Sequence, residues 1–407
     1  MRPIGPTNPG VFSGANLENA RDHNRRVAIE TVRVHGPLSR ADLARITGLS
    51  VQTISNIAEE LIAASLLLET PVSTGMRGKP PKLLTINPDG AYSIGLQLDH
   101  NWLIGVLLDI TGVRRGEIVV QVDSPAPQAG LVALEKAARN LAVGANIQLE
   151  QICGVSVVMP GPFEVDPIAN NGPTVLPGWA DVAVADRLAE RLNLPVSLEN
   201  DATAAAMGEH YFGVARQHRN IVVIFVGTGL GGGVLVNGQP YRGAFGNAGE
   251  IGHMSVYPEG RRCYCGNQGC AETYLSVHAA YEHLGYARTP PAYDELVDRF
   301  RTGERQFDTW MNKAAIVLRL LVVNLENLFD PEAVIVNGFM PHPILAELQR
   351  RALPLPSSVA SRRRREVPRL ILGAAGQKVA ALGAAVLPLF YSFGHLTHVS
   401  AAIPVKR

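Results

Sequence analysis

One short stretch constrains this chain more than any other: Gly252–Cys270, which reads GHMSVYPEGRRCYCGNQGC. Three of the four cysteines in the chain lie here within eight residues, and a histidine precedes the first of them by ten. Thiolates and imidazole are the ligands that tetrahedral zinc prefers, and one histidine with three cysteines makes a closed structural site. A disulfide is the alternative, but it leaves one cysteine over and needs an oxidising compartment. The spacing predicts structural Zn2+ bound by His253, Cys263, Cys265 and Cys270.

The rest of the composition is that of an ordinary globular chain. The 407 residues predict two or three domains, and 46% hydrophobic with 18% charged residues is enough to bury a core. The sequence shows no signal peptide and no apolar run of about eighteen residues, so we expect a cytoplasmic protein without a membrane span. A net charge of +1 means that binding to DNA would depend on a local surface.

The N-terminal quarter has the pattern of a winged helix-turn-helix. Residues 1–20 are rich in Pro, Gly and Asn and predict a disordered tail. Residues 21–88 predict the DNA-binding domain: a helix from Asp22, a second from Ser39 to Thr47 and a third from Ser50 to about Ala64. Two strands follow, 66–69 and 82–86, joined by a Gly/Pro-rich basic tip.

In such a domain the second helix of the pair enters the major groove with its N-terminal residues. The residues there that suit base edges are Ser50, Gln52, Thr53 and Asn56, and Arg77 and Lys79 in the tip suit a narrow A·T minor groove. The partner predicted from this pattern is a double-stranded DNA operator. A three-helix unit that binds another protein is the alternative, because residues 1–90 hold only two more basic than acidic side chains.

After a turn at residues 87–90 the pattern changes to α/β. We expect a first lobe at 89–200, completed by about 376–407, and a second lobe with the zinc site at 201–375. The sequence pattern of three strands, a helix and a strand starts once in each half of this region, which predicts two related lobes. The expected strands are 93–99, 103–109, 117–122, 152–158, 196–198, 221–225 and 334–336, and the expected helices are 131–143, 182–192 and 379–388, with 276–330 mainly helical.

Polar residues at strand ends and near the zinc segment are the candidate site. Asn200 and Asp201 follow a strand, where a carboxylate can accept a sugar hydroxyl or act as a general base; a helix cap is the alternative for Asp201. Zinc would hold Glu250 and Glu272 rigidly beside it. Gly227, Thr228, Gly229, Gly231 and Gly232 follow a strand as a phosphate loop would, or form a tight turn between two strands.

Together these motifs resemble the ROK family of sugar-responsive repressors and sugar kinases, over essentially the whole chain after residue 20. The resemblance implies an α/β chain in which the winged helix-turn-helix precedes a two-lobed, actin-like or ribonuclease-H-like sugar kinase fold. It implies that a monosaccharide or sugar derivative acts as effector, and that the protein is a homodimer or homotetramer. It also implies a sugar site between the lobes, formed by Asn200, Asp201, Glu250, His253 and Glu272.

The chain departs from the family's kinases where ATP would bind. Their Asp-x-Gly-x-Thr loop is here Asp99-His100-Asn101-Trp102-Leu103, without the glycine or threonine, and Val175 stands where an asparagine contacts the sugar. We therefore expect a sugar-responsive repressor that is not an enzyme, with a vestigial phosphate loop. The alternatives are an active sugar kinase with Asp201 as base, or a module regulated by an acidic partner protein at Arg362–Arg365.

Overall fold

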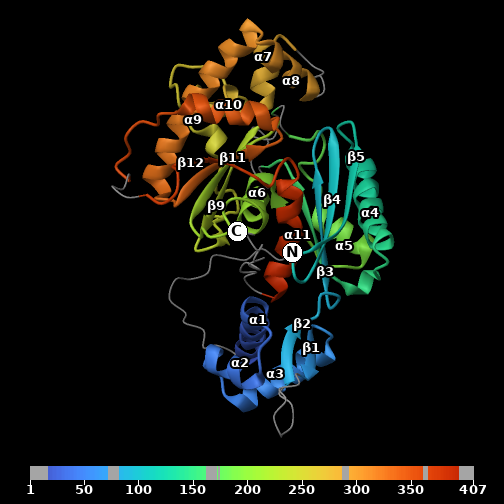
Figure 1. Ribbon diagram of the computed structural model, residues 1–407. Coiled ribbons are helices and arrows are strands. Elements are labelled where there is room, and N and C mark those ends of the chain that lie inside the picture. Colours follow the sequence, from blue (N-terminus) through green and yellow to red (C-terminus); the bar gives the residue numbers. More distant parts are fainter. Residues whose placement is uncertain are drawn as a thin grey trace. The chain divides into compact units, whose positions relative to one another are not determined.

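The computed structural model describes residues 17–71, 82–161, 172, 175–286, 293–360 and 365–393. The chain forms two compact units, one up to Gly90 and one spanning Ala91–Tyr391 (Figure 1). The tip residues Arg77 and Lys79, Pro162 and Arg362–Arg364 lie outside the described residues. In the part that is described, no helix is both long and apolar enough to cross a membrane.

The first unit contains three helices and a β-hairpin. They are α1 (Leu17–His35), α2 (Arg40–Thr47), α3 (Val51–Ala63), β1 (Leu67–Pro71) and β2 (Lys82–Ile86), with β1 and β2 antiparallel. Ser39 caps α2 and Ser50 caps α3, while Gly48 turns the chain between them at a φ of 72°. Buried Leu43, Ile54 and Leu61 join the helices. Helix α1 begins at Leu17, so residues 17–20, which we expected in the tail, are helical.

The second unit contains two five-stranded sheets with one topology. The first sheet has the order β5-β4-β3-β6-β7 and the second has β10-β9-β8-β11-β12. In each sheet, the strand that comes first in the chain (β3 or β8) is central. The next two strands lie antiparallel on one side of it, and the last two lie parallel on the other side. The bounds are β3 Tyr92–Leu98, β4 Trp102–Asp109, β5 Arg114–Gln121, β6 Ile152–Met159, β7 Val196–Asn200, β8 Ile221–Val226, β9 Leu230–Val236, β10 Gln239–Pro240, β11 Ala333–Gly338 and β12 Leu370–Leu372.

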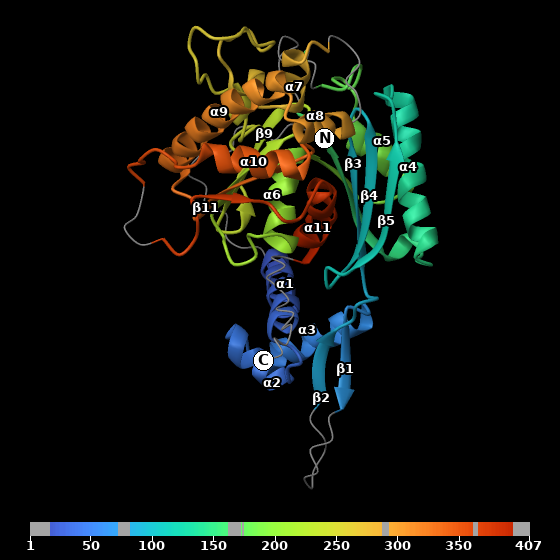
Figure 2. The same ribbon diagram turned by 45° about the horizontal axis from the view of Figure 1, so that its top comes forward.

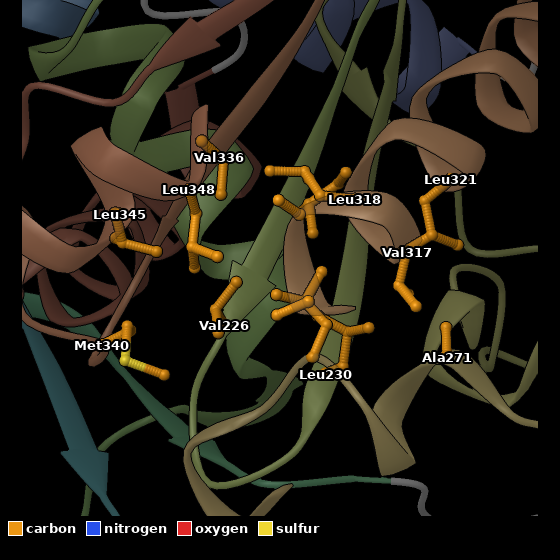
Figure 3. Packing of buried hydrophobic residues seen from close by; sticks show 14 of the residues in the cluster. Val226, Leu230, Ala271, Val317, Leu318, Leu321, Val336, Met340, Leu345 and Leu348 are labelled. Carbon is orange, nitrogen blue, oxygen red and sulfur yellow. The ribbon is translucent and has the colours of Figure 1, made fainter. Parts of the chain in front are cut away.

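Helices cover both faces of each sheet. α4 (Pro127–Gly144) and α5 (Val184–Leu192) pack on one face of the first sheet around Leu96, Leu107 and Val157 (Figure 2). On the second sheet, alternate residues of β8 and β11 join α9 (Arg305–Phe329) and α10 (His342–Ala352) in one core that includes Val226, Leu318 and Leu345 (Figure 3). α7 (Val277–His283) and α8 (Tyr293–Thr302) complete this lobe.

A pair of helices, α6 (Asp201–Phe212) and α11 (Val379–Phe393), lies between the two sheets (Figure 1). Their backbones approach so closely that a Cβ on Gly383 would lie 1.7 Å from the Ala204 carbonyl oxygen. A Cβ on Gly208 would lie 2.2 Å from the Val379 carbonyl oxygen. α11 also meets the first sheet, where Ser93 donates to the Ala385 carbonyl. Glycine is therefore required at this crossing.

Candidate functional site

The four predicted zinc ligands lie together, with their ligand atoms all within 4.8 Å of one another. Cys265 Sγ and Cys270 Sγ are 3.7 Å apart, and Cys263 Sγ is 3.6 Å from His253 Nδ1. Tetrahedral zinc with bonds of about 2.3 Å to sulfur and 2.0–2.1 Å to nitrogen requires separations of roughly 3.8 and 3.6 Å. All four cysteines are free, so the disulfide alternative is not realised. The residues present fit structural zinc.

Short local interactions hold the cluster. His253 ends a turn of 3-10 helix, Ile251–His253, and Cys270 caps another, Ala271–Thr273. Isolated bridges pair Ser255 with Cys270 and Arg262 with Gln268. Gly269 has a φ of 70°, and a Cβ there would lie 1.5 Å from the Tyr257 carbonyl oxygen. The sequence therefore forms a compact knuckle in which glycine allows the chain to cross itself.

The predicted sugar-site residues line one pocket. Its lining residues include the end of β7, the start of β9 and the segment around the cysteine cluster. Its described lining combines Asp99, Pro160, Gly161, Asn200, Asp201, Phe225, Thr228, Gly229, Leu230, Gly231, Glu250, His253, Tyr264, Glu272 and Phe339. The cavity has a volume of about 40 Å3 and is partly open to solvent. All five residues proposed from the resemblance are thus brought together, and their binding of a sugar remains a prediction.

Asn200 and Asp201 reach the pocket from the end of β7. Asn200 caps α6, because its Oδ1 accepts from the backbone N–H of Ala202 and Thr203. Asp201 accepts from the Ala202 N–H at 2.7 Å. Burial, followed by the Asp99 carboxylate and then Glu250, raises the pKa of Asp201 to about 8. Both residues therefore line the pocket, and Asn200 also caps the helix.

Residues 250–272, which contain the four predicted zinc ligands, supply two more carboxyl groups and the imidazole of the pocket. Burial raises the pKa of Glu250, and burial also raises that of Glu272 to about 7. Glu272 accepts from the Leu230 N–H at 2.9 Å, which ties it to the start of β9. His253 presents Nδ1 to the cysteines, while its Nε2 lies 4.0 Å from Glu250. The imidazole thus joins the metal cluster to the pocket.

Two pocket residues with polar side chains, Asp99 and Tyr264, were not among the predicted site residues. Asp99 is 2% exposed, its pKa is raised by burial, and its Oδ2 has no hydrogen-bond partner among the described residues. Tyr264 places its hydroxyl 3.3 Å from His253 Nε2. The strand-end position of Asp99 was a usable signal. Nothing in the spacing of the cysteines indicated that the residue between two of them enters the pocket.

The glycine run forms a tight turn between β8 and β9, and its role as a vestigial phosphate loop remains a prediction. Gly227 donates to the Gly229 carbonyl at 3.0 Å, and β9 begins at Leu230. Gly231 and Gly232 are therefore strand residues rather than loop residues. A Cβ on Gly233 would lie 2.0 Å from the Ala202 carbonyl oxygen, so glycine is needed there for packing against α6.

Aromatic side chains stand on the other side of this turn. A second pocket of about 680 Å3 is lined in part by Trp102, Tyr293 and Lys378, and it shares Phe339 with the first pocket. Tyr293 stacks on Phe339 at 6.3 Å and 17°. The Tyr293 hydroxyl is buried beside the side chains of Asp99, Thr228 and Asn101, and burial raises its pKa. Aromatic rings thus mark the boundary of the two pockets.

The first unit presents its candidate base-reading residues at the start of α3. Gln52 and Asn56 are exposed, and the Gln52 amide donates to Asn56 at 3.0 Å. Ser50 and Thr53 interact with each other in the helix cap. Several flanking arginines are already paired: Arg33 with Glu30, Arg40 with Glu59 and Glu69, and Arg45 with Asp42.

Known proteins resemble this chain over most of its length. The xylose repressor of Bacillus subtilis (strain 168) is 28% identical over 329 residues, which cover 80% of this chain and 85% of that protein. The crystal structure of a ROK family transcriptional regulator, a homolog of the E. coli MLC protein, superimposes with a TM-score of 0.73 at 22% identity, covering 92% of this chain and 98% of the other.

A ROK hexokinase from Thermus thermophilus covers 72% of this chain and 97% of its own, with a TM-score of 0.57 and 29% identity. The matches confirm the predicted fold class. They include a regulator and a kinase, so kinship alone does not decide between these activities. The model of the ROK family matches residues 113–389, and the chain belongs to the ROK family.

Proposed function

We propose that this protein is a DNA-binding transcriptional regulator, most simply a repressor, of genes for carbohydrate uptake or metabolism. Its effector is a neutral monosaccharide bound in the pocket lined by Asn200, Asp201, Glu250, His253 and Glu272. The observation that carries the proposal is the presence, in one chain, of a helix-turn-helix with a hairpin and a pocket lined by hydroxyl-binding groups. Binding to a chromosomal operator places the protein in the cytoplasm.

The chemistry of the pocket favours a sugar. Asp201, Glu250 and Glu272 offer carboxyl groups, and His253 offers a ring N–H when zinc is held at Nδ1. Asp99 Oδ2 is buried without a hydrogen-bond partner among the described residues, and a ligand hydroxyl would satisfy it. Zinc supplies no chemistry in this scheme beyond holding the loop.

The charge of the pocket favours an unphosphorylated sugar. Four carboxyl groups line it, and none of its described lining residues is a lysine or arginine. Phosphate recognition in proteins normally uses arginine, lysine or a row of backbone N–H groups. A sugar phosphate would bring negative charge beside Asp99, Asp201 and Glu250 with no basic side chain in the described lining to offset it, whereas hydroxyl groups can hydrogen-bond to carboxyl groups in either protonation state.

DNA binding is assigned to the start of α3, with Gln52 and Asn56 as base-reading residues and Ser50 and Thr53 near phosphates. Arg77 and Lys79 are proposed minor-groove contacts. A homodimer or homotetramer fits a palindromic operator, because the symmetry of such sites mirrors that of the protein.

The test is binding of the purified protein to its own upstream DNA at fixed salt, with and without a panel of neutral monosaccharides and their phosphates. We expect one neutral sugar to change the DNA affinity and its phosphate to have no effect. A change with the phosphate alone would overturn the charge argument. Operator binding that no sugar alters would contradict a sugar-responsive regulator.

The second candidate function is an ATP-dependent sugar kinase, favoured by Asp201 at the strand end and by the ROK hexokinase among the structural matches. Against it stand Trp102 in place of a small loop residue and the Tyr293–Phe339 stack between the pockets. Release of ADP that depends on sugar and disappears in Asp201→Asn would establish the kinase. We expect none above background.

A further inference from the structure

The long helix α9 is apolar on two faces, and the core of its own lobe covers only one of them. Val317, Leu318 and Leu321 point into that core (Figure 3). The other face, here called the outer face of α9, carries residues at intervals of three or four: Lys313, Ile316, Leu320, Val323 and Asn327. Its three apolar side chains are only partly buried by the described residues, and Ile316 is 46% exposed. A helix that is apolar all round is normally buried all round, so we expect a further surface to cover this face.

The outer face of α9 lacks the charged residues that normally face solvent on a surface helix. Between residues 314 and 329 the only ionisable side chains are Arg319 and Glu326. Both are engaged within the chain, because Arg319 donates to the Ala352 carbonyl oxygen at 2.9 Å and Glu326 is buried against two arginines. What remains outward is apolar or neutral, and depletion of charge is typical of the centre of a protein–protein interface.

A neighbouring segment adds apolar side chains beside the same helix. Hydrogen bonds from Arg319 and to Asn327 tie both ends of residues 352–359 to α9. Within this segment Leu353 is 50% exposed and Val359 is 94% exposed. Large apolar side chains exposed singly are common, but a group of them around an uncharged helix face indicates a site of contact with another molecule.

The outer face of α9 is complementary to itself. When two copies of the helix cross antiparallel about a twofold axis between Leu320 and Val323, each Leu320 meets Val323 of the second copy. In the same register Lys313 meets Asp330 of the second copy, and both of these residues are exposed at the two ends of the face. A twofold axis makes every contact twice, so opposite charges meet at both ends and apolar side chains meet in the middle.

We propose that the outer face of α9 is the surface through which two copies of this chain form a twofold dimer. Ile316 then lies against Asn327 of the second copy, and the segment of residues 352–359 borders the contact on each side. The inference goes beyond the proposed function, because it names the surface that joins the copies. A dimer is also what a helix-turn-helix unit needs in order to contact two half-sites of a palindromic operator.

The first experiment is sedimentation equilibrium of the full-length protein over a series of concentrations. We expect a mass twice the 43.6 kDa of one chain. Leu320→Glu should raise the Kd of the dimer by at least about 100-fold, because the twofold axis buries the new carboxylate twice without a partner. Val143→Glu is the matched control: Val143 is a 78% exposed apolar residue at the end of α4, and its replacement should leave the Kd unchanged.

A charge exchange tests the register of the two helices. Lys313→Glu and Asp330→Lys each create two like-charge contacts in a dimer, so each variant alone should dimerise on the order of tenfold more weakly at low salt. A mixture of the two variants restores both opposite-charge contacts and should form a mixed dimer with the Kd of the unaltered protein. Lys313 also lies 4.9 Å from the centroid of the Tyr274 ring, and a loss of that contact within one chain would not be repaired by mixing.

Circular dichroism checks that each variant is folded, and the mixture carries the test if Leu320→Glu does not fold. A monomeric unaltered protein, or a Leu320→Glu dimer of unaltered Kd, would overturn the inference. A mixture that dimerises no better than its components would overturn the proposed pairing of the helices. Operator binding with a sugar response is measured on the same unaltered protein, so a failure of the proposed function is seen separately from a failure of the interface.

Discussion

Single side chains at the zinc cluster combine two tasks, and His253 does so most clearly. Its Nδ1 faces Cys263 while its Nε2 faces the pocket. A histidine bound to metal through one nitrogen has its other N–H fixed in direction, so the metal determines how the ring meets a ligand. In the proposed function, a metal bound here would therefore contribute to recognition without touching the effector.

Replacing Cys265 with serine is expected to abolish stoichiometric zinc binding. The loss should exceed the ~10–100-fold that is typical of removing a residue that hydrogen-bonds to a metal ligand, because a thiolate ligand is lost outright. The sugar response should disappear with the metal, since His253 and Glu250 then lose their fixed positions. Atomic emission spectroscopy measures the zinc, and sugar titration of operator binding measures the response.

Cys153→Ser is the control for this change. Cys153 lies in β6, outside the metal cluster, and should keep one zinc per chain and the full response. A Cys265→Ser protein that lacks zinc but responds normally to sugar would show that the metal plays no part in effector binding.

We expect Asp201 to make the stability of the protein depend on pH. Its pKa is raised from 3.8 to about 8, mainly by burial, so the folded protein keeps a proton that the unfolded chain releases between these values. Folding is therefore favoured less as the pH rises through this window. Asp201→Asn should remove part of this slope, on the order of a few kcal/mol in total.

Urea unfolding at pH 5, 6, 7 and 8 measures the slope in the Asp201→Asn protein. Asp186→Asn, on the exposed face of α5, is the control and should leave the slope unchanged. If Asp201→Asn and the unaltered protein lose stability equally between pH 5 and 8, the carboxyl group of Asp201 does not hold the proton in the folded state.

Helices and strands show how much the sequence could predict. The strands with continuous apolar runs, such as β3, β6 and β8, were located to within one or two residues, because burial on both faces leaves a plain hydrophobic signal. β9 was missed, since three of its residues are Gly231, Gly232 and Gly233, and the rule that glycine marks a loop overrode the strand pattern.

The glycines of β9 are explained by what lies against them, which a local pattern does not contain. Ala202 of α6 and the Gly249 carbonyl approach this strand within 3 Å of where a Cβ would be. The contacts of Tyr264 were hidden for the same reason: they depend on how the zinc knuckle folds back over β9. The polar residues at strand ends were predictable, because strand ends gather at one edge of a sheet.

The crossing of α6 and α11 gives a prediction for helix packing. Gly383→Ala should destabilise the protein by about 1–3 kcal/mol or more, since its Cβ would overlap the Ala204 carbonyl oxygen and neither helix can move freely between two sheets. Gly144→Ala is the matched control. It ends α4 with open space around it and should be neutral or slightly stabilising.

The free energy of unfolding in urea compares these two glycine variants. Equal stability of Gly383→Ala and the unaltered protein would mean that α6 and α11 separate by enough to admit a methyl group. The control distinguishes such relaxation from a general effect of removing glycine in a helix.

The proposed function assigns DNA binding to the first unit and effector binding to the second, and it requires that the two communicate. Arg242 is one side chain that could respond to a ligand in the pocket. It pairs with Glu199, which directly precedes Asn200 and Asp201, and it also contacts Tyr391 of α11. Arg242 lies eight residues before Glu250, and Glu199 lies directly before Asn200. The Arg242–Glu199 ion pair therefore connects the two chain segments that carry these pocket residues.

Thermodynamic linkage makes the communication measurable from either end. If the sugar changes the affinity for the operator by some factor, the operator must change the affinity for the sugar by the same factor, typically about 5–150-fold. We expect calorimetric titration of the sugar, with and without a saturating operator duplex, to give the factor found from DNA binding with and without sugar. Arg242→Ala should reduce both factors together, because it removes a contact shared by the two sides of the pocket. A sugar that binds equally well to the free and the DNA-bound protein would shift no equilibrium, however tightly it binds, and would leave the pocket without a regulatory role.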